Sequence, residues 1–253
     1  MSREIRVLPT LDALMLAAAD AIVADAARAI DETGRFVLAL SGGSTPRRLY
    51  ALLAGPTYAA RIAWDRVEVC FGDERCVPPD DAASNYRMAQ ETLLAHVPVE
   101  PSRVHRIHGE DAPASAASAY EHTLRAVLAT PRGAPQPVAG RRIDLALLGM
   151  GDNGHTLSLF PGSPTVHERG HWAVPDTVDA TPPTRVTLTA PIVNAAAHAL
   201  FLVAGADKAP MLRRVLEGPH DPDALPAQLI APTDGRLTWL VDAAAAAELT
   251  RMT

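Results

Sequence analysis

The chain contains 253 residues, 48% of them hydrophobic and 21% charged, and its formal net charge is −6. A chain of this length can bury a large core and suits one α/β domain or two small ones. The acidic balance disfavours a general nucleic-acid binder, because such a protein needs a basic surface. The cysteines Cys70 and Cys76 are too few for a disulfide framework or a four-thiolate metal site. We therefore expect no nucleic-acid partner and no bound metal.

The N-terminal region predicts neither a secretory signal nor a membrane span. It lacks a basic segment followed by an apolar one, and the apolar stretch over residues 14–30 is interrupted by Asp20, Asp25 and Arg28. We therefore expect a cytoplasmic protein without a membrane partner. The sequence carries no signal for an oligomeric state.

Strands and helices alternate along the chain. Apolar spacing and capping residues predict helices over residues 11–31 (ending near Gly34), 46–53, 86–94 (with Ser84 as N-cap), 114–128 and 209–216, and an alanine-rich helix after residue 241. Apolar runs predict strands over residues 36–40, 67–71, 104–107, 143–148, 185–189, 198–204 and 237–241. Residues 130–140 predict a surface linker, and residues 163–183 an irregular segment. The pattern is typical of a mostly parallel sheet with helices on both faces, and no boundary splits residues 1–253, so we expect a single domain.

The stretch SGGSTP at residues 41–46 lies between a predicted strand and a predicted helix that has Pro46 at its first position. Two adjacent glycines let the backbone turn tightly and approach a ligand, and a helix N-terminus attracts an anion. The stretch therefore predicts a phosphate cradle. It would consist of Gly42, Gly43, Ser44 and Thr45. The alternative is an ordinary turn capped by Ser44 or Thr45, since the spacing matches neither a Walker loop nor GxGxxG.

Four predicted strands end in polar or glycine-rich loops, at residues 41–45, 73–75, 149–155 and 205–208. Ligands of open α/β sheets bind beyond the carboxyl ends of the strands, so we expect these loops to form one pocket. The pocket would combine cations, carboxylates and an imidazole, which suits a small phosphorylated molecule. The side chains in question are Asp73, Glu74, Arg75, His155 and Lys208.

His155 is the candidate general base, because an imidazole titrates near neutral pH; the alternative is a histidine that only caps or packs. Arg75 and Lys208 are candidate phosphate ligands, against the alternative of solvated surface cations. Arg185, just before a predicted strand, is a weaker candidate. Asp73 would bound the pocket or orient water and sugar hydroxyls. Glu74 is expected to be a structural partner of Arg75.

The motifs together resemble those of the 6-phosphogluconolactonase family. They are SGGSTP at residues 41–46, DERCVPPD at 73–80 followed by SNY at 84–86, GMGDNGHTLSLFPG at 149–162, RVTLT at 185–189, and Gly205 with Lys208. The resemblance implies a modified Rossmann-like sheet of the kind found in glucosamine-6-phosphate deaminases. It also implies hydrolysis of 6-phospho-D-glucono-1,5-lactone to 6-phosphogluconate in the pentose phosphate pathway, with no required cofactor and with a small phosphosugar lactone as a partner.

One position departs from the family pattern. An Asp usually precedes the Gly-His pair, whereas this chain has Asn153, with Asp152 one residue earlier. A carboxylate would accept the second N–H of the histidine, fix its tautomer and raise its basicity. Our hypothesis is that Asn153 keeps this geometry but leaves His155 less basic.

Three other functions compete with the lactonase interpretation. An amino-sugar phosphate deaminase would carry an acidic residue before the Pro-Gly pair, where this chain has Phe160. A sugar-phosphate sensor would need an attached DNA-binding module, for which no helix-turn-helix pattern is evident, and would have little use for His155. A dehydrogenase would need the GxGxxG spacing that the first glycine loop lacks.

Overall fold

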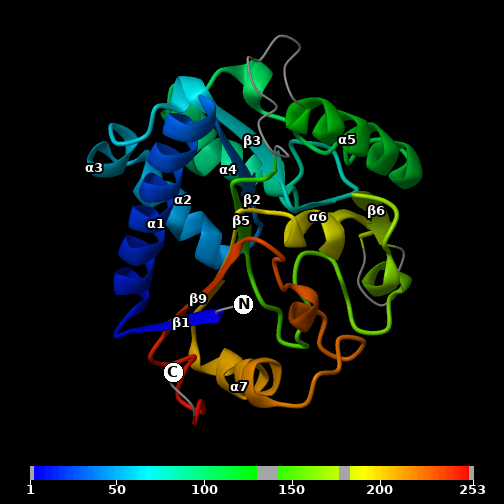
Figure 1. Ribbon diagram of the computed structural model, residues 1–253. Coiled ribbons are helices and arrows are strands. Elements are labelled where there is room, and N and C mark those ends of the chain that lie inside the picture. The colour runs from blue at the N-terminus through cyan, green and yellow to red at the C-terminus, as the bar shows by residue number, and fades with distance from the viewer. Residues whose placement is uncertain (1–2, 130–141, 177–182, 251–253) are drawn as a thin grey trace.

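The computed structural model describes residues 3–129, 142–176 and 183–250 (Figure 1). Its centre is a six-stranded, wholly parallel sheet in the order β1-β9-β8-β5-β2-β3. The strands are β1 (Arg3–Leu8), β2 (Phe36–Leu40), β3 (Val67–Phe71), β5 (Leu145–Leu148), β8 (His198–Val203) and β9 (Arg236–Asp242). A three-stranded antiparallel sheet has the order β4-β7-β6 and contains β4 (Asp73–Arg75), β6 (Ala173–Asp176) and β7 (Arg185–Leu188).

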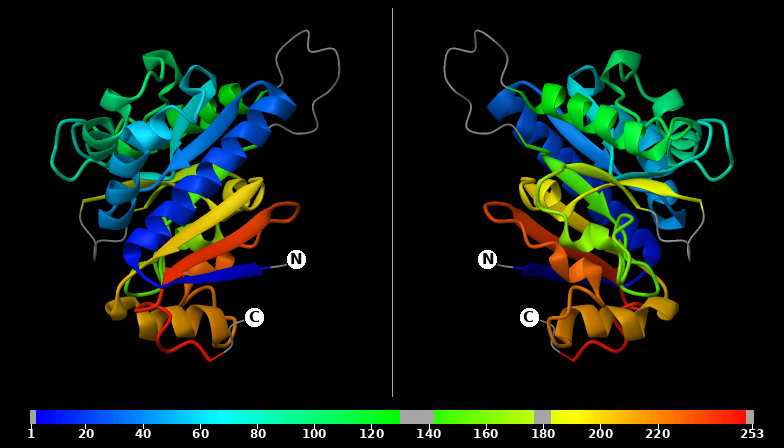
Figure 2. Two further views of the ribbon diagram at one scale, coloured as in Figure 1. Left: turned by 90° about the vertical axis from the view of Figure 1, so that its left-hand side faces the viewer. Right: turned by 90° about the vertical axis from the view of Figure 1, so that its right-hand side faces the viewer.

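Helices cover both faces of the parallel sheet, as the sequence predicts (Figure 1). The longest, α1, crosses one face, and the views in Figure 2 place α5 and the small sheet on the other side. The α-helices are α1 (Leu11–Thr33), α2 (Ser44–Ala54), α3 (Pro56–Ala59), α4 (Asn85–Thr92), α5 (Pro113–Leu128), α6 (Ala190–Asn194) and α7 (Ala209–Glu217). Short 3₁₀ helices are η1 (Trp64–Arg66), η2 (Leu94–His96), η3 (Pro101–Arg103), η4 (Pro164–His167), η5 (Ala206–Lys208) and η6 (Pro226–Leu229).

Local signals explain the elements that were predicted correctly. β2 and β8 are buried along their whole length, as apolar runs in a parallel sheet should be. α1 begins after Thr10, whose side chain accepts a hydrogen bond from Ala13 N–H, and ends at Gly34 in the left-handed conformation. Ser84 caps α4 by accepting from Arg87 N–H.

Several predicted boundaries are wrong. α2 begins at Ser44, two residues before Pro46, and its N-cap is Gly43 without any side-chain cap, so capping by Ser44 or Thr45 is excluded. The strand predicted over residues 104–107 is only an isolated bridge between Val104 and Val69. Residues 143–148 form a strand only from Leu145 onward.

Three further predictions need correction. The alanine-rich residues 243–248 form turns rather than a helix. Residues 163–183, predicted as irregular, contain η4 and β6. The predicted loop at residues 73–75 is strand β4, and β1 was not predicted at all. The linker predicted over residues 130–140 lies outside the described residues.

Candidate functional site

A small pocket opens at the carboxyl ends of β2 and β5, which are neighbours in the parallel sheet. Its volume is about 190 Å³. The predicted residues that line it are Gly42, Gly43, Asp73, Arg75, His155 and Arg185. The lining is completed by residues that were not among the predicted side chains, namely Ser41, Asn85, Gly149, Met150, Gly151 and Leu157. Ser44, Thr45, Asn153 and Lys208 are not part of the lining.

The glycine loop is held in place from the helix that follows it. Tyr50 on α2 donates a hydrogen bond to Ser41 O at 2.7 Å and accepts one from Ser41 N–H at 2.9 Å. Gly43 has φ 105°, a conformation that favours glycine. A Cβ on Gly42 would lie 2.0 Å from Asn85 Oδ1, so this position also requires a glycine. The loop therefore presents bare backbone to the pocket at the N-terminus of α2.

His155 is oriented by Asn153. The Asn153 Oδ1 atom accepts hydrogen bonds from His155 N–H at 3.2 Å and from ring Nδ1 at 2.6 Å. The backbone N–H can only donate, so the Asn153 atom is the amide oxygen and Nδ1 carries the proton. Nε2 is left with a lone pair. A Cβ on Gly151 would lie 2.0 Å from the ring, and the Phe160 ring packs against it with a centroid separation of 4.5 Å.

The electrostatic environment keeps His155 neutral at physiological pH. The pKa of His155 is lowered to about 4, chiefly by burial. The charges of Arg185 and Lys208 contribute to this shift, and those of Asp73 and Asp152 oppose it. A neutral imidazole with a free Nε2 has the form that a general base requires.

Asp73 is buried, and both of its carboxylate oxygens are hydrogen-bonded. Ser158 Oγ donates to Oδ2 at 2.6 Å, and Asn85 Nδ2 donates to Oδ1 at 3.2 Å and to the backbone oxygen at 3.0 Å. Ser158 is itself fixed, because its N–H donates to Thr187 Oγ1 at 3.1 Å. This network holds a fixed negative charge in the pocket wall.

Leu157 precedes Ser158 and lies in the pocket wall with φ 55°. Among the described residues it is the only one other than glycine with a positive φ. Such a conformation is strained for a bulky side chain and is found chiefly at functional sites. It follows from the tight turn in which Leu159 N–H donates to Thr156 O at 3.0 Å.

Two guanidinium groups enter the pocket with unused hydrogen-bond donors. Arg75 Nη1 donates to Ala83 O at 2.5 Å, but its Nε is buried without a partner in the described part of the chain, and so is Arg185 Nε. Burial lowers the pKa of Arg185, Asp73 opposes the shift, and the charge of Arg75 adds to it. Two cations with unsatisfied donors favour an anionic ligand at this place.

Glu74 is structural, as predicted, but its partner is a helix rather than the Arg75 guanidinium. Its carboxylate accepts from the N–H groups of Arg75, Asn85 and Tyr86 at 2.7–2.8 Å and from Ser84 Oγ at 3.0 Å. It therefore binds the N-terminus of α4, where a negative charge is favourable. Burial raises the pKa of Glu74, and these hydrogen bonds act against that shift.

Lys208 lies close enough to influence His155 but is engaged elsewhere. Its ammonium group pairs with the Asp152 carboxylate, on the loop that carries His155, and this contact lowers the pKa of Asp152. Asp152 is 81% exposed, so the pair is readily opened by solvent or by a competing anion.

Over residues 3–129, 142–176 and 183–250, no cluster of three or more His, Cys, Asp or Glu side chains has the arrangement of a metal site. No helix in the same ranges is long and apolar enough to cross a membrane.

A family model described as glucosamine-6-phosphate isomerases/6-phosphogluconolactonase matches residues 9–239. A protein of Nostoc sp. named 6-phosphogluconolactonase is 40% identical over 250 residues, which is 98% of this chain and 99% of that protein. The crystal structure of 6-phosphogluconolactonase from Leishmania guyanensis is 31% identical, with a TM-score of 0.83 over 99% of this chain and all of that one.

A monomeric glucosamine-6-phosphate deaminase has a TM-score of 0.79 at 24% identity, over 97% of this chain and 99% of that one. At this identity the likeness concerns the fold alone, and it confirms the predicted deaminase-like sheet.

Proposed function

The chain belongs to the family of glucosamine-6-phosphate isomerases and 6-phosphogluconolactonases, and from this premise we propose that it hydrolyses 6-phospho-D-glucono-1,5-lactone to 6-phospho-D-gluconate. The reaction is the lactonase step of the pentose phosphate pathway. The observation that carries the proposal is a neutral His155 whose free Nε2 belongs to a pocket with two guanidinium groups. The names of the Nostoc and Leishmania proteins support the same activity.

The geometry supports hydrolysis over amino-sugar deamination. The position at which a deaminase would carry an acidic residue is occupied by Phe160, whose ring packs on His155 and lies 5.0 Å from the Arg185 guanidinium. No carboxylate is therefore available there for the ring opening and proton shuttling of a deaminase. Lactone hydrolysis, by contrast, needs one general base and a bound anionic substrate.

In the proposed mechanism the loop at residues 41–45 binds the phosphate together with Arg75 and Arg185. Lys208 joins them once the phosphate displaces Asp152. His155 Nε2 takes a proton from water as the water oxygen attacks the lactone carbonyl, and the nearby guanidinium charges stabilise the tetrahedral oxyanion. The C1–ring oxygen bond then breaks, and the imidazolium returns its proton to that oxygen. Asn153 holds the ring throughout.

The extent of the domain and the place of the reaction stay predictions. We propose that residues 1–253 act as one domain, which is supported by the match over 99% of the Nostoc protein. We also propose that this chain acts in the cytoplasm, although some relatives from rice are named chloroplastic.

The deciding experiment compares the wild type with His155→Ala. The lactone is generated in situ, and 6-phosphogluconate is followed above the spontaneous rate. We expect the variant to lose about 10²- to 10⁴-fold in kcat with an unchanged circular dichroism spectrum, as removal of a general base should. Turnover retained in the variant would disprove the mechanism while keeping the substrate. No turnover in the wild type would disprove the proposed function itself.

A further inference from the structure

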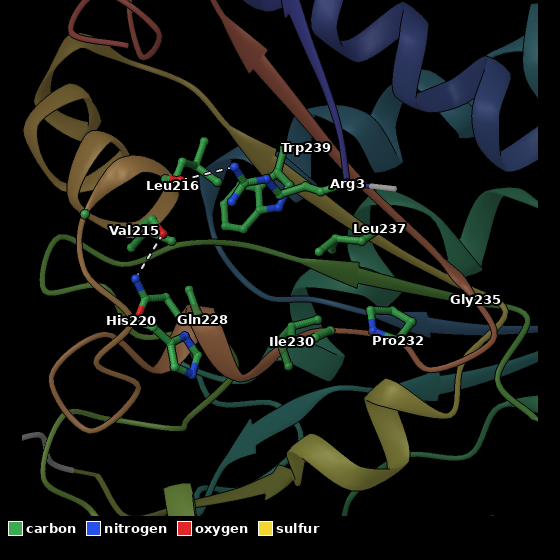
Figure 3. Close-up of a pocket in the computed structure, with 13 residues that line it drawn as sticks. Arg3, Val215, Leu216, His220, Gln228, Ile230, Pro232, Gly235, Leu237 and Trp239 are labelled. Atoms are coloured by element: carbon green, nitrogen blue, oxygen red, sulfur yellow. Dashed lines mark hydrogen bonds between the residues drawn. The ribbon is translucent and has the colours of Figure 1, made fainter. Parts of the chain in front are cut away.

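A second cavity, of about 410 Å³, shares no lining residue with the pocket just described (Figure 3). Its floor is formed by Leu237 and Trp239 of β9, and Arg3 of β1 lies beside them. Both strands are parallel to β2 and β5, and the cavity lies against their first residues, so it faces the amino ends of the strands, whereas His155 lies at the carboxyl ends. The volume is within the range of small-molecule sites, about 300–1,000 Å³.

One wall of this cavity is fixed by Gln228 of η6. Its Nε2 donates to Val215 O at 3.1 Å (Figure 3). The same Nε2 donates to Pro219 O at 3.1 Å, and Oε1 accepts from Asp221 N–H at 2.7 Å. These bonds join η6 to the C-terminal end of α7. The wall is therefore formed before any ligand arrives, which is typical of binding sites.

The lining is apolar and locally positive in an acidic protein. It contains no Asp or Glu, while Arg3 contributes a cation that has no carboxylate within ion-pair distance in the described part of the chain. Arg3 Nη2 donates to Leu216 O at 3.1 Å, which fixes the side chain across the cavity wall. His220 adds an imidazole to the same lining.

Trp239 contributes an aromatic ring to the cavity lining. Its side chain is only 2% exposed, and the Phe201 ring of β8 is stacked against it with a centroid separation of 3.7 Å, so the ring is held rigidly. A flat ring suits the apolar floor, and an acidic group suits Arg3.

The cavity is physically connected to the loop that carries His155. Ala227, which lines the cavity from η6, donates its N–H to Gly154 O at 2.9 Å. Gly154 is packed so closely that a Cβ there would lie 2.8 Å from Leu225. A ligand that shifts η6 must therefore shift the residue before His155. α7 provides a second link, because its C-terminal turn lines the cavity and Lys208 is its N-cap.

We propose that this cavity is an effector site for a planar organic anion, an aromatic or heteroaromatic ring with one acidic group, and that its occupancy is transmitted to His155 through η6 and Gly154. This effector role rests on the proposed function in one respect, because it assumes that His155 is the general base. Binding at the cavity is independent of it.

The binding test uses the fluorescent anion anilinonaphthalene sulfonate and a matched pair of variants. Ala231 is exposed and lines the cavity, so Ala231→Glu adds a negative charge there and Ala231→Gln adds only a similar bulk. We expect one probe molecule per wild-type chain, and binding at least about tenfold weaker for Ala231→Glu than for Ala231→Gln, because like charges repel across the site. Arg3→Gln should weaken binding as well. Equal affinity for the matched pair, or no saturable binding, would overturn the site.

The coupling test follows the ring-proton resonance of His155 by NMR, assigned through its loss in His155→Gln. We expect saturating probe to shift this resonance in the wild type and in Ala231→Gln but not in Ala231→Glu. This readout needs no turnover, so its result is separate from the fate of the lactonase proposal. Binding at the cavity without a shift of the His155 resonance would overturn the effector role.

Discussion

At the scale of single residues, Asn153 orients His155, and we propose that it leaves His155 less basic than a carboxylate at the same position would. The amide oxygen fixes the tautomer but adds no charge, so nothing at Nδ1 offsets the burial that lowers the pKa of His155 to about 4. Because the base must be neutral, activity should persist well below neutral pH and be lost only as the pH falls through the pKa of His155.

Asn153→Asp should therefore move the acid limb of the activity profile to higher pH. The added carboxylate stabilises the imidazolium and raises the pKa of His155. The measurement is kcat/KM against pH, with Asn153→Ala as the control that removes the hydrogen bond without adding a charge. A profile that does not change in Asn153→Asp would refute this account of the residue.

Ser158 is fully buried and positions Asp73 through a hydrogen bond to its carboxylate. Ser158→Ala should lower stability by about 1.5–3 kcal/mol, since a buried carboxylate loses a donor, and should also reduce kcat/KM. Ser163 provides a matched control, because it donates to the buried Asp176 at 2.7 Å and neither residue lines the pocket. Urea unfolding and steady-state kinetics should show a similar stability loss in Ser163→Ala but normal activity. A loss of activity in both variants would mean that Ser158 acts only through folding.

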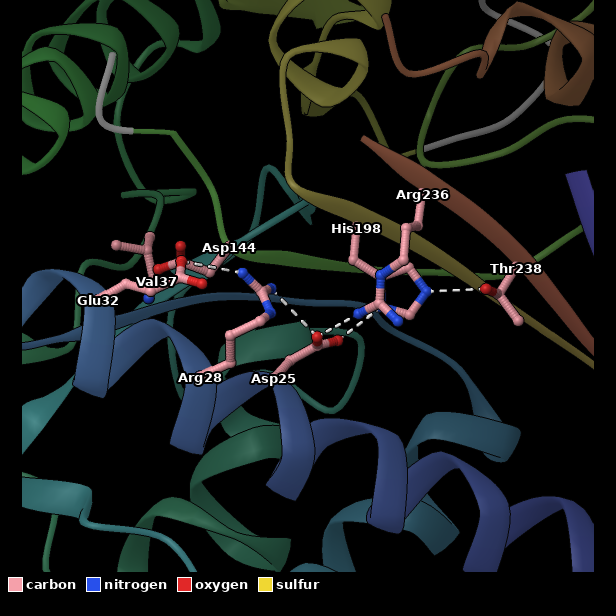
Figure 4. A network of polar contacts seen from close by, with 8 residues as sticks. All are labelled: Asp25, Arg28, Glu32, Val37, Asp144, His198, Arg236 and Thr238. Atoms are coloured by element: carbon pink, nitrogen blue, oxygen red, sulfur yellow. Dashed lines mark hydrogen bonds and ion pairs between the residues drawn. The ribbon is translucent and has the colours of Figure 1, made fainter. Parts of the chain in front are cut away.

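At the scale of elements, a buried ionic network ties α1 to the centre of the parallel sheet (Figure 4). Asp25 on α1 is 2% exposed and bonds His198 Nδ1 on β8 at 2.6 Å and Arg236 on β9. His198 Nε2 and Thr238 Oγ1 are 3.0 Å apart. Burial acts to raise the pKa of Asp25, but the hydrogen bond from His198 and the charges of His198 and Arg236 outweigh it, so this pKa is lowered.

Asp25→Asn should cost about 1.5–3 kcal/mol at neutral pH, because His198 and Arg236 lose a buried, charged hydrogen-bond acceptor. The stabilisation by Asp25 is complete above its unfolded pKa, about 3.9, and is lost as the pH falls through the lower folded value. The difference between wild type and variant in urea unfolding should accordingly shrink in acid. The control is Asp20→Asn. Asp20 also lies on α1 but forms an exposed pair with Arg61, so this variant should cost no more than about 1 kcal/mol. A difference that stays constant down to the acid limit would contradict the charged role of Asp25.

The sequence predicts elements well where burial is uniform and poorly where it is not. β2 is a continuous apolar run, β3 is apolar except at Glu68, and β8 is apolar after His198; each was predicted within one residue of its bounds. β1 was missed because it is an edge strand whose residues are mostly exposed, so its sequence has little apolar character.

For the site, the motifs at strand ends identified His155 with its partner Asn153, and they identified Asp73 but not the partners of Asp73. Ser158 bonds Asp73 across 85 positions of sequence, which no local pattern reveals. Asn85 lies within the SNY motif, and that motif was the available signal for it. Lys208 was predicted as a pocket residue, yet it lies outside the lining because Asp152 holds its ammonium group.

At the scale of the whole molecule, the sheet carries two cavities at its opposite ends. The carboxyl ends of the strands surround the small polar pocket, and the amino ends of β1 and β9 border the larger apolar one. α7 spans the distance between them, with Lys208 before its first turn and Leu216 near its last. The two ends of the sheet are thus joined by one rigid helix and by the Ala227–Gly154 hydrogen bond.

Because β1 pairs with β9, this edge of the parallel sheet can form only after β9 has been synthesised. Arg3 of β1 pairs with Leu237 of β9, and 234 positions of sequence separate the two residues. Until β9 has been synthesised β1 has no strand beside it, so this edge of the sheet cannot form from local contacts. A nascent chain stopped before residue 236 would carry α1 and β2 yet lack the strand that joins β1 to the rest of the sheet. β1 is synthesised before the other strands of the parallel sheet but is among the last of them to be paired.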